Sequence, residues 1–191
     1  MGGGTPKTSE PTYWGGNIPW FSVVDTPPGS EIFIFHTEKK ITEAGLQNSS
    51  ARLLEAGDTI ISARGTVGNL AIAGCLMAFN QSCYGLKGVN GYGSCFVFLA
   101  AKNMVTKLQS LAHGSVFSTI TRQTFDSVHL PRPGIAIAEQ FELATSPLFE
   151  QIRANVAESG TLAATRDLLL PKLMSGEIRV KDAEKLAGEA L

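Results

Sequence analysis

The sequence predicts an α+β protein: a mixed, mainly antiparallel β domain with small helices, followed by one long α-helix with the pattern of a coiled-coil spacer. Twenty glycines and nine prolines are spread among short apolar runs, which is typical of strands joined by turns. The last part of the chain instead carries apolar residues at helical spacing. With 191 residues and 43% hydrophobic content, the chain has room for one full core plus an appended element. We expect the domain over 1–134, the helical region over 135–180 and a tail over 181–191.

Strands are predicted where apolar runs stand between turn residues. A turn at Gly57-Asp58 leads into a hairpin with strands over 59–63 and 70–73. The connection between these two strands carries one arginine and two glycines. Further strands are expected over 78–86 and 94–99.

Shorter helices are predicted at two places inside the domain. The region between 37 and 50 indicates either a short helix that ends at Gly45 or a loop. Residues 101–112 have apolar side chains at helical spacing, with Gly114 as the stop. An extended exit from the domain is expected over 128–133, because each proline there disfavours helix at the residue before it.

The region after residue 134 is predicted to be helical in two pieces. A short helix over 136–143 should break at Ser146-Pro147, since serine is a good N-cap and proline a good first helical residue. The second helix should run from Pro147 to about Leu170, roughly 36 Å at ~1.5 Å per residue. One face forms a seam of four-three spacing: Leu148, Ile152, Asn155, Leu162, Leu169 and Leu173. A helix with a one-sided apolar seam needs a partner helix to be stable in water.

The charge of the chain is nearly balanced, at −1. Residues 1–134 carry 10 Lys and Arg against 8 Asp and Glu, which gives +2, and residues 135–191 carry 6 against 9, which gives −3. A protein that holds DNA by charge alone is far more basic. If DNA is the ligand, affinity must come from two copies or from partner subunits.

The cysteines and the hydropathy point to a reducing, aqueous compartment. Cys75, Cys83 and Cys95 include no C-x-x-C pair, so we expect buried reduced thiols and neither a disulfide framework nor a zinc site. No apolar run approaches the ~18 residues that span a bilayer. We expect a cytoplasmic protein with no membrane partner.

Common catalytic motifs are missing from the sequence. The nucleotide-binding, hydrolase and zinc-protease motifs G-x-x-x-x-G-K-[ST], G-x-G-x-x-G, G-x-S-x-G and H-E-x-x-H do not occur. We therefore expect no catalytic residue, no metal site and no cofactor in this chain. One enzymatic alternative stays open: Asp25, Glu38 and Lys40 have the residue types of a small metal-dependent nuclease.

Polar loops offer the chemistry that reads DNA. Arginine suits guanine, asparagine and glutamine suit adenine, and serine or threonine suit either base or a phosphate. The residues expected to contact DNA are Lys7, Thr8, Arg64, Thr66, Asn69, Asn80, Gln81, Ser115, Ser118, Thr119, Thr121, Arg122 and Gln123. The alternative is that these loops are polar only because they face water.

The whole pattern resembles the specificity subunit of type I restriction-modification systems. The likeness lies in Gly-Gly-Gly-Thr-Pro-Lys-Thr at 2–8, Tyr-Trp-Gly-Gly-Asn-Ile-Pro-Trp at 13–20, Ile-Ser-Ala-Arg-Gly-Thr-Val-Gly at 61–68, Asn-Gln-Ser-Cys at 80–83, residues 114–121, and Arg-Asp-Leu-Leu-Leu-Pro-Lys-Leu-Met-Ser-Gly-Glu-Ile at 166–178. These segments occur in order along nearly the whole chain. The usual chain of this family carries two such halves, and this sequence contains one.

The resemblance implies a non-catalytic target-recognition domain that reads one half of a bipartite double-stranded DNA site. Two copies paired through their helices as an antiparallel homodimer would then read an interrupted palindrome. The resemblance also implies methyltransferase subunits that bring S-adenosylmethionine to an adenine, and it leaves room for a restriction subunit. A regulatory half-subunit, which binds methyltransferase subunits without a target of its own, is the alternative within this family.

Overall fold

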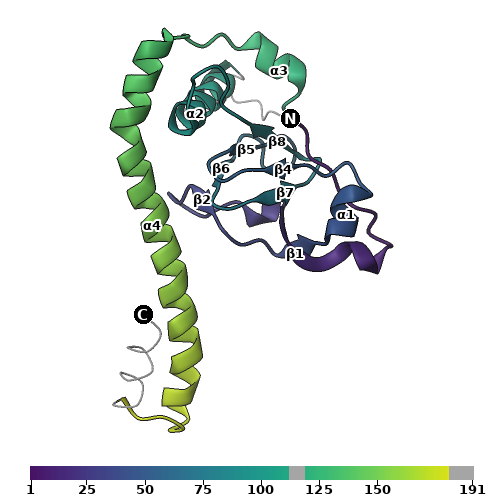
Figure 1. The fold of residues 1–191 in the computed structure, drawn as a ribbon, viewed down its shortest axis with the longest axis vertical. Helices are drawn as coiled ribbons and strands as arrows, with labels where there is room; N and C mark the ends of the chain where they lie inside the picture. The colour runs from purple at the N-terminus through teal and green to yellow at the C-terminus, as the bar shows by residue number, and fades with distance from the viewer. Residues whose placement is uncertain (112–118, 181–191) are drawn as a thin grey trace. The chain divides into compact units, whose positions relative to one another are not determined.

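The computed structural model describes residues 1–111 and 119–180, and the chain divides into two compact units, Met1–Phe149 and Glu150–Leu191. The first unit holds all of the described strands (Figure 1). The described part of the second unit consists of the later turns of helix α4 (Ile135–Met174) and the residues up to 180. The predicted α+β fold is confirmed, because four of the six strand pairings are antiparallel and two are parallel.

The first of two four-stranded sheets has the order β3-β1-β7-β4. Its strands are β3 (Lys39–Ile41), β1 (Trp14–Phe21), β7 (Met77–Phe79) and β4 (Leu53–Leu54). β1 runs antiparallel to β3 and parallel to β7, while β4 runs antiparallel to β7. Two 3₁₀ turns flank β1, at Pro11–Tyr13 and Val23–Asp25.

The second sheet has the order β2-β6-β5-β8 and contains the predicted hairpin. Its strands are β2 (Phe33–Ile34), β6 (Leu70–Ala73), β5 (Thr59–Ser62) and β8 (Cys83–Leu86). β5 pairs antiparallel with β6 on one side and with β8 on the other. The run expected as one strand over 78–86 is therefore two strands, β7 and β8, which belong to different sheets and are joined by a turn.

The two sheets share an apolar core. Phe21 and Phe79 of the first sheet cluster with Ile60 and Cys83 of the second, and all four are buried. Burial of such side chains contributes about 1.5–3 kcal/mol each to folding. This shared cluster holds the ends of β7 and β8 together, and with them the turn that connects the two sheets.

Helices cover the outer faces of the sheets. α2 (Ser94–Leu111) packs Met104 and Leu108 against Ile61 of β5. α3 (Arg122–Ser127) places Phe125 edge-on to Tyr84 of β8, with ring centroids 5.4 Å apart. These two helices therefore pack on the face of the second sheet that presents Ile61, next to Ala63 at the end of β5.

The prediction of a strand over 94–99 was wrong, because these residues form the first turns of α2. Cys95, Phe98, Ala101, Met104 and Leu108 are buried, and their spacing of three and four residues is that of a helix face. A short apolar run rich in phenylalanine and valine does not by itself distinguish a strand from a buried helix. The helix predicted over 101–112 is the remainder of this same element.

The short helix between 37 and 50 is present as α1 (Glu43–Gln47), but Gly45 does not end it. Gly45 lies in the middle of α1, and a Cβ at this position would lie 2.4 Å from the backbone oxygen of Tyr13. The glycine is therefore required by the close approach of a neighbouring segment. The C-cap is Asn48.

The break expected at Ser146-Pro147 is absent, because α4 continues from Ile135 to Met174. A proline inside a helix removes one backbone hydrogen bond and usually kinks or ends it. Here contacts to α2 hold the helix on both sides of Pro147: Phe141 packs against Phe96, and Phe149 packs against Phe98. Tertiary packing thus overrides the local sequence preference.

The first compact unit ends at Phe149, so the opening turns of α4 belong to it. The boundary expected near residue 134 stays a prediction, although the extended segment before α4 is present as expected. Within the described parts of the chain, no helix has the length and apolar character needed to cross a membrane.

Candidate nucleic-acid interface

Three of the polar segments that the sequence nominated meet at one residue, Ala63, directly after β5. The Ala63 N–H donates to the carbonyl of Ser82, with N and O 2.7 Å apart. The Ala63 carbonyl accepts from the N–H of Ile120, at 2.9 Å. The loop over 64–69, the turn over 80–82 and the segment over 119–123 therefore start from adjacent points of one sheet end.

The opening segment lies against the same turn. The Gly4 N–H donates to the carbonyl of Phe79 at 2.9 Å, and the Thr5 hydroxyl donates to the side-chain oxygen of Gln81. A Cβ on Gly3 would lie 2.2 Å from the backbone oxygen of Asn80. Glycine at position 3 is what allows the opening segment to lie this close to the turn.

The loop over 64–69 is held from inside by Ser62. The Ser62 hydroxyl accepts from the N–H of Asn69 at 2.9 Å and donates to the carbonyl of Thr66. Gly65 and Gly68 have φ angles of 77° and 88°, in the left-handed region that favours glycine. The loop is consequently folded tightly around a buried hydroxyl, and Arg64 and Thr66 are exposed.

The segment over 119–123 presents its polar residues at the start of α3. Thr121 caps α3, with its hydroxyl accepting from the N–H of Thr124 at 3.3 Å. Arg122 and Gln123 in the first turn are exposed. Burial and, after it, the positive charge of Arg122 lower the pKa of the Met1 ammonium.

The structure gathers the nominated residues of the segments over 64–69, 80–82 and 119–123 around Ala63, whereas Thr8 lies at a hollow beside Lys39 and Lys40. Those with exposed side chains are Lys7, Thr8, Arg64, Thr66, Gln81, Thr121, Arg122 and Gln123, while Asn69, Asn80 and Thr119 are half-buried. Ser115 and Ser118 lie outside the described residues.

Two of the nominated residues have clear structural roles in their own loops. The Asn80 side-chain oxygen accepts from the N–H of Ser82 at 3.0 Å, and Thr121 caps α3. These contacts account for a polar residue at both positions without DNA. The Gln81 side-chain oxygen likewise accepts from the Thr5 hydroxyl. Arg64, Arg122 and Gln123 are thus the more informative candidates.

Three further lysines lie near this surface, and sequence reasoning did not assign them to it. Lys39 and Lys40 line a hollow of about 450 Å³ together with Thr5 and Thr8 of the opening segment. Lys102 of α2 lines a second hollow, of about 440 Å³, beside Asn69. No local pattern could have found them, because the pairing of β3 with β1 and the packing of α2 join residues distant in sequence.

Among the residues of the nuclease alternative, Asp25 has a clear structural role. The Asp25 carboxylate accepts from the Ser22 N–H at 2.8 Å and from the Glu38 N–H at 2.6 Å, which fixes the turn after β1. Over residues 1–111 and 119–180, no cluster of three His, Cys, Asp or Glu side chains could hold a metal ion.

None of the three cysteines forms a disulfide, and Cys83 and Cys95 are buried while Cys75 is half-buried. Burial and the nearby negative charge of Asp25 raise the pKa of Cys83 to about 12. Reactivity belongs to the thiolate form, which is scarce at neutral pH when the pKa is this high. The arrangement gives Cys83 a packing role and no role as a nucleophile.

Alkylation should report this burial directly. At pH 8 we expect iodoacetamide to modify Cys83 in the folded protein at least about a hundredfold more slowly than in urea, because only a small fraction is thiolate and the sulfur is covered. Peptide mass spectrometry of timed samples measures both rates. Equal rates in folded and unfolded protein would contradict the buried position.

Comparison with known proteins identifies the family. A family model described as the type I restriction modification DNA specificity domain matches residues 1–144. The chain belongs to this family. Among curated members, the MjaIX specificity subunit of Methanocaldococcus jannaschii is 31% identical over 146 residues, 75% of this chain and 33% of its own length. The HindI specificity subunit of Haemophilus influenzae is 26% identical over 179 residues, 92% of this chain and 39% of its own length.

Two solved structures share the fold. The HsdS subunit of Thermoanaerobacter tengcongensis has a TM-score of 0.54 at 17% identity, over 92% of this chain and 42% of that chain. A chain from a structure of the type I R-M system has a TM-score of 0.56 at 19% identity, over 90% of this chain and 42% of that one. The chain thus spans a third to two fifths of the length of the relatives it matches.

Proposed function

We propose that this chain reads one half of a bipartite DNA site for a type I restriction-modification complex, through the surface formed around Ala63. The observation that supports this most is the pair of backbone hydrogen bonds at Ala63, which gathers three polar segments at one sheet end. The opening segment joins them through Thr5 and Gln81. Segments that are far apart in sequence and polar at their tips, on a rigid support, are what base reading requires.

The chemistry of this surface divides into two roles. Arg64 and Arg122 can give a guanine two hydrogen bonds from one guanidinium, and Gln81 and Gln123 can do the same for adenine. Lys7 suits phosphate, as do Lys39 and Lys40 in the hollow beside Thr8, and phosphate contacts position the protein without reading sequence. The net charge of −1 means that phosphate attraction from one chain is weak, so partner subunits supply the rest of the affinity.

The partners bind along α4 in this proposal. The seam residues Leu148, Ile152 and Leu162 are 64%, 38% and 58% exposed, so they are unburied within one chain. We propose that a second copy covers the seam, giving a homodimer that reads an interrupted palindrome.

A further apolar surface on α4 is available for methyltransferase subunits. It is formed by Leu168, Leu170 and Met174, which are 62%, 51% and 81% exposed. In such a complex these subunits bind S-adenosylmethionine and carry out the methylation.

Arg64 provides the test of base reading. With methyltransferase subunits present, Arg64→Ala should weaken binding to the preferred duplex by ~1–3 kcal/mol, and preference at one base pair should disappear. Fluorescence anisotropy on the preferred duplex and on its single-base variants measures both effects.

Two variants serve as controls. Arg64→Lys keeps the charge and loses the paired donors, so it should behave like Arg64→Ala if a base is read and like the native chain if a phosphate is bound. Lys7→Ala should weaken all duplexes equally and reduce the salt dependence. If the native chain binds methyltransferase subunits but no duplex is preferred, base reading is wrong and the regulatory half-subunit takes its place.

A further inference from the structure

The opening turns of α4 are attached to α2 by a carboxylate. Glu142 of α4 accepts two hydrogen bonds, from the N–H groups of Cys95 and Phe96 in the first turn of α2, at 3.0 and 3.1 Å. The first N–H groups of a helix have no partner within it, and a negative charge is favoured there. Glu142 thus supplies from 47 residues away the cap that α2 needs. This joint lies wholly within the Met1–Phe149 unit.

Tyr92 makes a second attachment between the residues that precede each helix. Its hydroxyl donates to the carbonyl of Pro133 at 2.7 Å and accepts from Nε of Arg132 at 3.0 Å. The Arg132 guanidinium also lies 5.6 Å from the centre of the Tyr92 ring. The segment leading into α4 is therefore tied to the segment leading into α2.

Glycines make room for this joint. A Cβ on Gly93 would lie 2.2 Å from the carboxyl carbon of Glu142. Gly91 has a φ of 86°, and a Cβ there would lie 3.0 Å from Ile135, the first residue of α4. A side chain at position 93 would displace the carboxylate from the end of α2.

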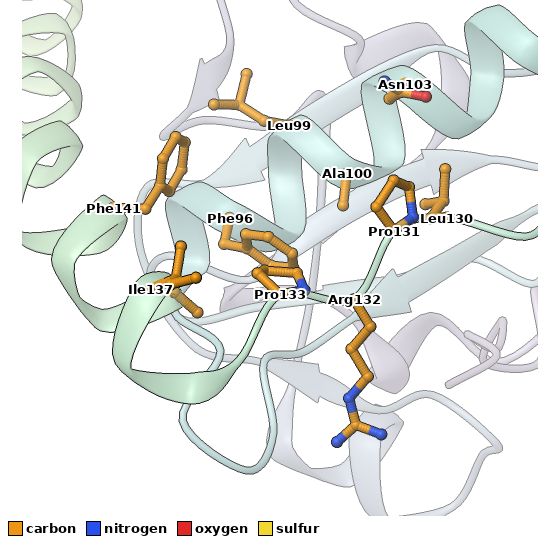
Figure 2. Close-up of a pocket in the computed structure, with 11 residues that line it drawn as sticks. Phe96, Leu99, Ala100, Asn103, Leu130, Pro131, Arg132, Pro133, Ile137 and Phe141 are labelled. Atoms are coloured by element: carbon orange, nitrogen blue, oxygen red, sulfur yellow. The ribbon is translucent and has the colours of Figure 1, made fainter.

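The apolar packing between α2 and α4 is interrupted, although Phe141 contacts Phe96 and Phe149 contacts Phe98. A hollow of about 440 Å³ separates apolar side chains of α2, such as Leu99, from Ile137 of α4 (Figure 2). Interdigitated side chains normally set the angle between packed helices. Here the side chains do not interdigitate across the hollow. The hydrogen bonds of Glu142 and Tyr92 therefore add to the ring contacts in setting the orientation of α4. In Figure 2 the Arg132 side chain extends away from the hollow.

We propose that Glu142 and Tyr92 are positioning residues that fix the direction of α4 at its start, and thereby the gap length between the two DNA half-sites. The inference rests on the proposed function. From Phe149 to Met174 α4 continues for 25 residues, about 38 Å at ~1.5 Å per residue. A tilt of about 10° at the joint would shift a partner bound at the far end by about 7 Å, the length of roughly two base-pair steps.

The test measures affinity as a function of gap length. Duplexes with the preferred half-sites and gaps changed by one to three base pairs are titrated with the complex of native chain and methyltransferase subunits. The variants are Glu142→Gln, which keeps the shape and loses the charge, and Tyr92→Phe, which loses only the hydroxyl. Glu158→Gln is the matched control, because Glu158 is an exposed glutamate of the same helix.

The native complex should lose about tenfold or more in affinity for each base pair of gap change. For Glu142→Gln and Tyr92→Phe we expect that loss to fall to about threefold or less, at a cost of under about tenfold at the best gap. Hydrogen exchange at the Cys95 and Phe96 amides should be faster in Glu142→Gln and unchanged in Glu158→Gln. If Glu142→Gln folds poorly, Tyr92→Phe alone provides the test, because it removes only one hydroxyl.

The outcomes separate the two proposals. A native complex without preference among duplexes overturns the proposed function. If the native complex has a sharp gap preference and both variants have the same gap profile as the native complex, the proposed role of Glu142 and Tyr92 is wrong and the proposed function stands. If the variants lose affinity equally at every gap length, the positioning role is also wrong, because such a loss shows that the two residues contribute to stability alone.

Discussion

Replacing Ile152 and Leu162 with aspartate in the same chain should leave the protein monomeric at micromolar concentrations, where the native chain should be a dimer. Both side chains are exposed in the single chain, so the substitutions should leave the folded monomer intact. In a paired seam each aspartate would put an unpaired charge among apolar side chains, and the symmetric dimer would contain four of them. We expect the dimer dissociation constant to rise by at least about a thousandfold.

Sedimentation velocity measures the change, and circular dichroism checks that helix content is kept. The matched control is Ala157→Asp with Ala164→Asp, which adds the same charges at exposed positions of α4 outside the seam. The control should remain dimeric. A dimer that survives the seam substitutions would contradict helix pairing through this face.

Phe79→Ala should destabilise the fold by about 3–5 kcal/mol, the usual range for removing a buried aromatic side chain. Phe79 is fully buried in β7 and belongs to the cluster that both sheets share. Its ring also supports the opening segment, since a Cβ on Gly3 would lie 2.6 Å from it. Removing the ring therefore weakens both the contact between the two sheets and the packing beneath the turn over 80–82.

Urea unfolding followed by tryptophan fluorescence measures this loss. Val24→Ala, at a side chain that is 74% exposed, is the control and should change the free energy of unfolding by less than about 0.5 kcal/mol. A loss below about 1 kcal/mol for Phe79→Ala would mean that the shared cluster does not hold the two sheets together.

Local patterns predicted much of the fold, and tertiary contacts explain where they failed. The β5–β6 hairpin follows from its turn residues and apolar alternation. The misassigned run over 94–99 and the missed continuation through Pro147 have a common cause. Each segment packs against the other: Phe96 and Phe98 of α2 contact Phe141 and Phe149 of α4. Neither partner is encoded within a short window of sequence.

The candidate site was predictable as a set of residue types but not as an arrangement. Residue chemistry nominated the loops that carry Arg64, Gln81 and Arg122. Their meeting at Ala63 depends on two hydrogen bonds between segments that lie far apart along the chain. The role of Glu142 could not be predicted from the sequence, because glutamate is common on the polar face of a helix. Its role follows only from the position of the α2 end.

Selection from a randomised duplex library, with this chain and methyltransferase subunits as bait, tests sequence reading most directly. We expect successive rounds to enrich one pair of inverted half-sites with a constant gap, and Arg64→Ala to lose the preference at one position of each half. A pool that stays random through selection, with retention that depends on salt alone, would contradict sequence reading.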